Sequence, residues 1–118
     1  MLPKKYRLKK RTAFAATYRT GLSYHRDGIT VFCGKKKTKD LPTKIGFVVS
    51  KKIHKRAVKR NRIKRLMRES LRLYIKSNPY FDTEHLSLVF VATTKLLDKN
   101  FSDINKGIKK ILGLINHD

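Results

Sequence analysis

The chain has 118 residues, and 30 basic against eight acidic side chains give it a formal net charge of +22 at pH 7. This length predicts one domain, residues 1–118, and a hydrophobic content of 40% excludes a wholly disordered chain. Positive charge in such excess opposes compaction and favours a polyanionic partner. Nucleic acid is the leading candidate, and an anionic membrane surface is the second.

Residues 1–10 read MLPKKYRLKK, and we expect them to form a basic N-terminal arm that is held loosely. Because no apolar stretch follows, we expect no signal peptide, and no window is long enough for a transmembrane helix. Cys33 is the sole cysteine, which excludes an internal disulfide and a thiolate cluster. We interpret it as a small buried hydrophobe in a reducing, cytoplasmic setting.

A short helix is predicted after the arm, with Thr12 as its N-cap and Gly21 as its stop. Phe14 and Tyr18 lie four residues apart and therefore share one face of this helix. Their spacing alone favours core positions, although a ligand-facing role stays open.

Three strands are predicted. Residues 28–33, GITVFC, are rich in β-branched and aromatic side chains. Residues 44–50, KIGFVVS, and residues 86–93, LSLVFVAT, are apolar on both faces, which is typical of interior strands. The charged residues 34–43 form the loop between the first two strands.

Two longer helices are predicted over residues 56–76 and 99–115, where apolar side chains recur at helical spacing. Because helices alternate with nearly continuous apolar strands, the sequence predicts an α/β layered fold. In projection, the first of these helices has an apolar stripe made of Ile63, Leu66, Met67, Ser70, Leu71 and Tyr74.

The other side of that helix is cationic. It carries Asn61, Arg62, Lys64, Arg65, Arg68 and Arg72, with Arg60 at the border. A solvated helix face normally mixes charges, but Glu69 is the only acid between Lys51 and Asp82. Pairs of like charge four residues apart repel by a few tenths of a kcal/mol each. This repulsion predicts an external polyanion that docks on the helix.

RNA fits this helix better than DNA. No helix precedes it in a helix-turn-helix arrangement, and no heptads follow it. Asn61 stands between two guanidinium groups, a mixture that suits a folded RNA offering phosphates, hydroxyls and base edges.

Two stretches resemble a known family. Residues 44–70 read KIGFVVSKKIHKRAVKRNRIKRLMRES, and residues 7–21 read RLKKRTAFAATYRTG. The first contains an RNR element within the longer pattern RNRxKRxxR, preceded by a strand ending in SKK. In this order, over about residues 6–115, the pattern resembles the protein subunit of bacterial ribonuclease P.

The resemblance implies an α/β (α+β) two-layer sandwich, with about three helices packing a mixed sheet of about four strands and a left-handed βαβ crossover. It also implies the accessory subunit of a ribonucleoprotein endoribonuclease. The RNA of that enzyme carries the active site, requires magnesium, and removes the 5′ leader from precursor tRNA. The expected partners are the catalytic RNA and precursor tRNA, without a membrane or an obligate protein partner.

Two sets of site residues follow from the resemblance. The residues expected to bind the catalytic RNA are Arg60, Asn61, Arg62, Lys64, Arg65 and Arg68, together with Lys51 and Lys52. The residues expected to line a cleft for the leader are Phe14, Tyr18 and Phe32. Aromatic rings suit that role because they stack on bases without demanding a sequence.

The chain shows no catalytic constellation of its own. Its eight acids and four histidines are scattered, and only Asp82 and Glu84 lie close together, in a predicted loop. We therefore expect no catalytic residue and assign no metal to the protein. The alternatives are a ribosomal protein or a general RNA chaperone, and, less favoured, a binder of membrane surfaces.

Overall fold

The computed structural model describes residues 2–37, 41–79 and 81–116. Its helices and strands, in chain order, are α1 (Arg11–Arg19), β1 (Ser23–Arg26), β2 (Ile29–Cys33), β3 (Lys44–Val48), α2 (Ala57–Ser77), β4 (Ser87–Ala92) and α3 (Phe101–Asn116). Two short 3₁₀ turns, Lys4–Tyr6 and Thr94–Leu96, precede α1 and α3.

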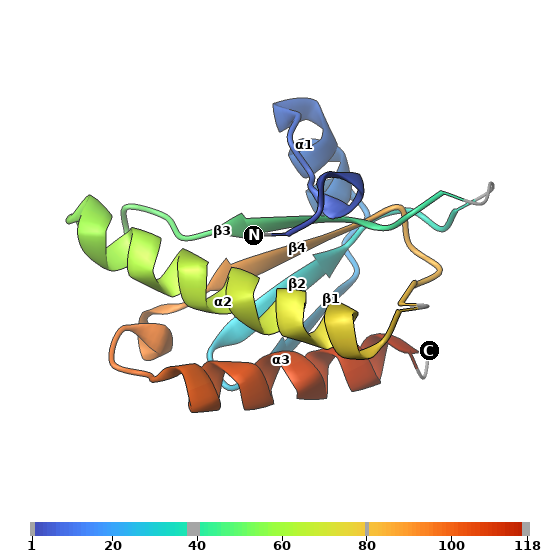
Figure 1. Cartoon of the computed structure of the whole chain (residues 1–118). Coiled ribbons are helices and arrows are strands. Elements are labelled where there is room, and N and C mark those ends of the chain that lie inside the picture. The colour runs from blue at the N-terminus through green and yellow to red at the C-terminus, as the bar shows by residue number, and fades with distance from the viewer. Residues whose placement is uncertain (1, 38–40, 80, 117–118) are drawn as a thin grey trace.

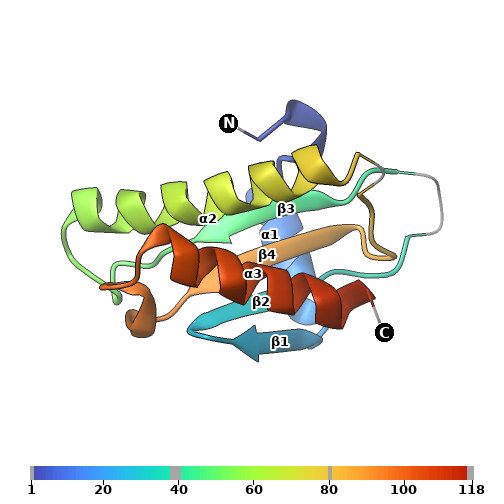
Figure 2. The ribbon, with the colours of Figure 1, turned by 60° about the horizontal axis from the view of Figure 1, so that its bottom comes forward.

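The four strands form one mixed sheet in the order β1-β2-β4-β3. β3 and β4 are parallel, and the other neighbouring pairs are antiparallel. Figure 1 shows α2 and α3 on one face of the sheet and α1 on the other. The helix α2 joins the parallel strands by a left-handed crossover (Figure 2), whereas about 98% of such connections are right-handed. The four-stranded mixed sheet and the crossover confirm the predicted fold class.

The main core lies between the sheet and the pair α2 and α3. On β2, the alternating residues Ile29, Val31 and Cys33 are fully buried on this side. The predicted apolar stripe of α2 packs against them, with Ile63, Met67, Ser70 and Leu71 buried, and with Leu66 and Tyr74 half-buried beside the core. The hydroxyl of Ser70 is satisfied by the side-chain oxygen of Asn105 on α3, 2.7 Å away.

β1 was not predicted, because its sequence SYHR is polar and mostly exposed. A turn at Asp27 and Gly28, with φ of 52° and 86°, connects it to β2. Two consecutive positive φ angles match the tight hairpin turn that favours Asp-Gly pairs. A Cβ on Gly28 would also lie 2.9 Å from Cβ of Lys95, so glycine is required here.

Two predictions about the first fifty residues are wrong. The N-terminal segment is not loose, since Leu2 and Tyr6 are only 2% and 5% exposed and belong to the core. The amide of Leu8 donates to the carbonyl of Ile45, 2.9 Å away. β3 is the edge strand of the sheet rather than an interior one. Its two faces are apolar because α2 covers one and the ring of Phe14 covers the other.

The start of α1 also differs from the prediction. The helix begins at Arg11 with Lys10 as its N-cap, so Thr12 lies inside the first turn and caps nothing. Its end agrees with the prediction, because Gly21 follows with a φ of 74°.

Buried hydroxyl groups fasten α1 to the sheet. Thr17 is 2% exposed, and its hydroxyl lies 2.5 Å from that of Ser87 on β4. We expect Thr17→Val, which keeps the shape and removes the hydroxyl, to lower the free energy of unfolding by about 1–3 kcal/mol, because Ser87 loses a buried partner. Urea denaturation measures this loss. Thr12→Val, on the exposed side of the same helix, is the control, and equal losses for the two variants would contradict the role of this bond.

Candidate nucleic-acid interface

The cationic face of α2 begins in the turn before the helix. Lys51 and Lys52 are exposed in this turn. No acidic residue lies in the first turn of α2, and its N-cap residue, Arg56, makes no capping bond with its side chain. Positive charges therefore add to the positive end of the helix dipole, an arrangement that favours an anion at this end.

Two of the predicted RNA-binding arginines also brace the fold. The guanidinium of Arg60 donates to the carbonyls of His54 and Lys55, at 2.9 and 2.8 Å. That of Arg62 donates to the carbonyl of Lys99, 3.2 Å away, and so links α2 to the segment before α3. A substitution of either arginine would mix a structural effect with an effect on binding.

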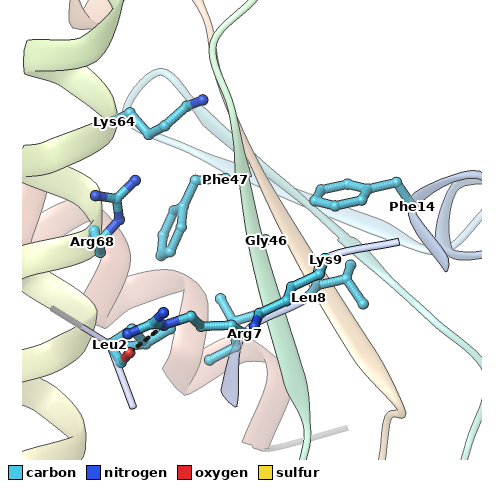
Figure 3. Close-up of a pocket in the computed structure, with 10 residues that line it drawn as sticks. Leu2, Arg7, Leu8, Lys9, Phe14, Gly46, Phe47, Lys64 and Arg68 are labelled. Carbon is cyan, nitrogen blue, oxygen red and sulfur yellow. Dashed lines mark hydrogen bonds between the residues drawn. The ribbon is translucent and has the colours of Figure 1, made fainter. Parts of the chain in front are cut away.

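The remaining predicted side chains on α2 are free of such bonds in the part of the chain that the structure describes. Asn61 and Arg65 are exposed, whereas Lys64 and Arg68 are half-buried. Lys64 and Arg68 point toward the outer edge of β3 (Figure 3). The face thus offers charges both outward and along the edge of the sheet.

Internal ion pairs do not neutralise this face. Within residues 2–37, 41–79 and 81–116, the ion pairs are Lys36–Glu84, Lys37–Asp82, Arg72–Glu69 and Lys110–Asp27. None of them involves a residue predicted to bind the catalytic RNA. Arg72 donates twice to Glu69, at 3.0 and 2.6 Å, and these hydrogen bonds lower the pKa of that carboxyl. The one acid on α2 is therefore already paired.

A pocket of about 340 Å³ lies at the outer edge of β3 (Figure 3). We call it the edge pocket. It is lined by Leu2, Arg7, Leu8, Lys9, Phe14, Ile45, Gly46, Phe47, Lys64 and Arg68. Three of these, namely Phe14, Lys64 and Arg68, are site residues predicted from the sequence, and the others were not predicted. The pocket joins three segments that are distant in sequence, and its position depends on β3 being an edge strand.

The three predicted aromatic residues lie on the other face of the sheet. Register places Phe32 of β2, Val89 of β4 and Gly46 of β3 in one row across the sheet. The ring of Phe14 covers Gly46 so closely that a Cβ there would lie 2.5 Å from two ring atoms. Tyr18 packs edge-to-face on Phe32, with ring centroids 5.0 Å apart. We call this group the aromatic surface.

The aromatic surface lies outside the main core, so its rings are not the core residues that their spacing alone favoured, and their role toward a ligand stays a prediction. Tyr18 is 38% exposed, and Phe14 and Phe32 are half-buried. Partial burial raises the pKa of the Tyr18 phenol further above neutral pH, where phenols are already uncharged. Three uncharged rings at one sheet face form a platform on which bases can stack.

The next row of the sheet extends this platform and was missed by the sequence analysis. It consists of Thr30, Val91 and Val48, which are all half-buried. His25 of β1 completes the row, with Nδ1 lying 2.8 Å from Oγ1 of Thr30. Alternation along β2 would have identified Thr30, but His25 required β1 to be recognised.

The described residues contain neither a membrane-spanning helix nor a cluster of metal ligands. No helix in them is long and apolar enough to cross a membrane. No three of their His, Cys, Asp or Glu side chains lie close enough to hold a metal ion.

The fold and these two surfaces define a basic α/β domain for binding nucleic acid, with a cationic helix on one face of the sheet and a stacking platform on the other. The comparisons with known proteins agree. The family model described as Ribonuclease P matches residues 2–116. The chain belongs to the ribonuclease P protein family.

Individual relatives support the same assignment. The chain is 36% identical over 107 residues to the ribonuclease P protein component of Clostridioides difficile, covering 89% of this chain and 87% of that one. It is 36% identical over 110 residues to that of Clostridium kluyveri, covering 91% of each. The solved RNase P protein of Staphylococcus aureus, 27% identical, superposes with a TM-score of 0.77 over 96% of this chain and 99% of that chain.

This membership confirms the main functional prediction. Ribonuclease P is a ribonucleoprotein endoribonuclease that processes tRNA, and the family supplies its protein subunit. The comparisons do not support the alternative of a ribosomal protein or a general RNA chaperone.

Proposed function

We propose that the cationic face of α2 binds the catalytic RNA and that the aromatic surface holds the 5′ leader of precursor tRNA. Two observations carry the proposal. Within the described residues, the predicted cationic side chains have no acid partners, and on the other face of the sheet Tyr18 packs on Phe32 while Phe14 covers Gly46. The two surfaces lie on opposite faces of β3, so one small domain can contact both RNAs at once.

Binding of the catalytic RNA follows from the charge. Phosphates that dock on Arg65 and its neighbours relieve the repulsion along α2 and release counterions from the RNA. Arginine suits this role because its planar guanidinium donates two parallel hydrogen bonds to a phosphate. Asn61, exposed between two arginines, adds an amide that can pair with a base edge or a ribose hydroxyl.

Binding of the leader follows from the geometry of the sheet. The rings of Tyr18 and Phe32 accept stacked bases, and stacking is worth about 1–3 kcal/mol per base regardless of sequence. The half-buried row of Thr30, Val91 and Val48 continues the platform with small side chains. A single strand can therefore lie across the sheet without being selected for its sequence.

The chain's contribution to cleavage is then to position the substrate. We propose that the catalytic groups and the required magnesium belong to the RNA, and that this chain holds the leader in place. Differential affinity for precursor over mature tRNA raises kcat/KM for the substrate and favours release of the product. We also propose a cytoplasmic location, supported by the single buried thiol of Cys33, and no obligate protein or membrane partner.

Reconstitution tests this proposal. The purified chain is mixed with its cognate catalytic RNA and precursor tRNA at low magnesium, and cleavage is compared with that by RNA alone. We expect faster cleavage and tighter binding of precursor than of mature tRNA. Cleavage no faster than with RNA alone would contradict the proposal, as would equal affinity for both tRNAs.

A further inference from the structure

The edge pocket combines an apolar floor with a cationic rim. Phe47 forms the floor and stacks on Phe90 of the neighbouring strand, with ring centroids 5.7 Å apart and planes at 24°. Figure 3 shows Lys64 and Arg68 extending from α2 on one side, while Arg7 and Lys9 come from the N-terminal segment. None of the lining residues is acidic. The pocket therefore favours a ligand that is anionic and also presents a flat apolar surface.

Backbone groups add a third feature. The carbonyl of Ile45 points away from β4, because it accepts a hydrogen bond from the amide of Leu8. Backbone groups two residues further along a strand point the same way, so those of Phe47 also face the outer edge. In the described residues, the N-terminal segment forms its bridge with β3 at Arg7 and Ile45, before Phe47 is reached. The backbone amide and carbonyl of Phe47 therefore offer a donor and an acceptor at the pocket.

We propose that the edge pocket binds one unpaired nucleotide of the catalytic RNA. Its base lies against the ring of Phe47, and its flanking phosphates lie among Arg68, Lys64, Arg7 and Lys9. This inference rests on the proposed function, since Lys64 and Arg68 belong to the same cationic face of α2. A volume of about 340 Å³ is enough for one nucleotide, because small-ligand sites begin at about 300 Å³.

The location of the pocket favours the catalytic RNA over the leader as the source of this nucleotide. Lys64 and Arg68 lie on the helix layer, whereas Tyr18 and Phe32 lie on the other face of the sheet. Phe14 borders both the edge pocket and the aromatic surface, because its ring covers Gly46 on the face of β3 that is opposite to α2. A leader that stacks on Tyr18 and Phe32 is separated from the ring of Phe47 by the strand itself.

The first test uses the wild-type chain and adenosine monophosphate as a probe, followed by NMR. We expect chemical-shift changes at the amides of Leu8, Gly46 and Phe47 and at the ring protons of Phe47. Inorganic phosphate is the control for charge alone. If phosphate shifts the same signals equally, or if the nucleotide leaves them unmoved, the base is not held in this pocket and the proposal is overturned.

The second test measures affinity for the catalytic RNA with Phe47→Leu, which keeps an apolar floor and removes the ring. We expect a loss of about tenfold, the order expected for one stacked base. Phe47→Tyr should bind within about twofold of wild type. Phe101→Leu makes the same change at a half-buried ring on α3 and should leave affinity unchanged. Urea denaturation of each variant shows whether folding accounts for any loss.

The outcomes separate this proposal from the proposed function. If Phe47→Leu binds the catalytic RNA as tightly as wild type while Arg65→Ala binds more weakly, the edge pocket is overturned and the cationic face stands. If Phe47→Leu weakens binding of long-leader precursor and leaves binding of catalytic RNA unchanged, the nucleotide comes from the substrate and the proposal is overturned. Loss of affinity for catalytic RNA alone supports it.

Discussion

Replacing Arg65 and Arg68 together by alanine is expected to weaken binding of the catalytic RNA by about 50-fold near 0.1 M salt. Each lost phosphate contact lowers the slope of log affinity against log salt by about 0.7–0.9, so the pair should lower it by about 1.4–1.8. In the described part of the chain, neither residue makes an internal ion pair or a side-chain hydrogen bond, whereas Arg62 donates to the carbonyl of Lys99 and so also supports the fold. Binding measured across a salt series gives both quantities.

The stability of the double variant provides a second readout. Arg65 is exposed, and Arg68 lies four residues from Lys64 and from Arg72, so its removal relieves like-charge repulsion. We expect the free energy of unfolding to change by no more than a few tenths of a kcal/mol. Lys106→Ala with Lys109→Ala removes two exposed charges from α3 and serves as the control. An equal fall in slope for both pairs would show that net charge, rather than the face of α2, determines binding.

The second large effect is expected at the aromatic surface. Tyr18→Leu combined with Phe32→Leu keeps an apolar surface but removes two rings, and should weaken binding of long-leader precursor tRNA by about 100-fold. Affinity for mature tRNA should stay within about twofold, because it has no leader to stack. Fluorescence anisotropy with both tRNAs, in the presence of catalytic RNA, measures the difference.

Tyr18→Phe is the matched control for this pair. It keeps the ring that packs on Phe32 and removes only the hydroxyl, so precursor binding should be nearly unchanged. Equal losses for precursor and mature tRNA in the leucine variant would place the leader elsewhere on the molecule. Phe14 is a poorer choice for this experiment, because its ring also covers Gly46. Its removal would disturb the packing of α1 on the sheet.

The sequence was most informative where periodicity was strong. α2 was predicted over residues 56–76 and spans Ala57–Ser77, and its apolar stripe packs on the sheet as expected. The cationic face was identified from a shortage of acids, a property that needs no three-dimensional information. Both predictions depend on one segment alone, which explains why they agree with the structure.

Features formed by several segments were harder to predict. The sequence of β3 predicts an interior strand because both of its faces are apolar, one covered by α2 and the other by the ring of Phe14 from α1. The sequence of a single strand does not show whether both of its edges are paired. The edge pocket was therefore missed, although two of its cationic residues had been identified. The hairpin of β1 and β2 did carry a local signal, because Asp27 and Gly28 form the pair that such turns favour.

The edge of β3 beyond Ile45, where the bridge with the N-terminal segment ends, has a consequence for how copies of this protein behave in solution. An unpaired edge strand invites a second copy to extend the sheet, a common route to aggregation. Here Arg7, Lys9, Lys64 and Arg68 flank that edge, so two copies meeting edge to edge would bring both sets of cations together. Electrostatic repulsion of this kind is longest-ranged at low ionic strength. The charges that attract a polynucleotide therefore also oppose edge-to-edge association of two unliganded chains.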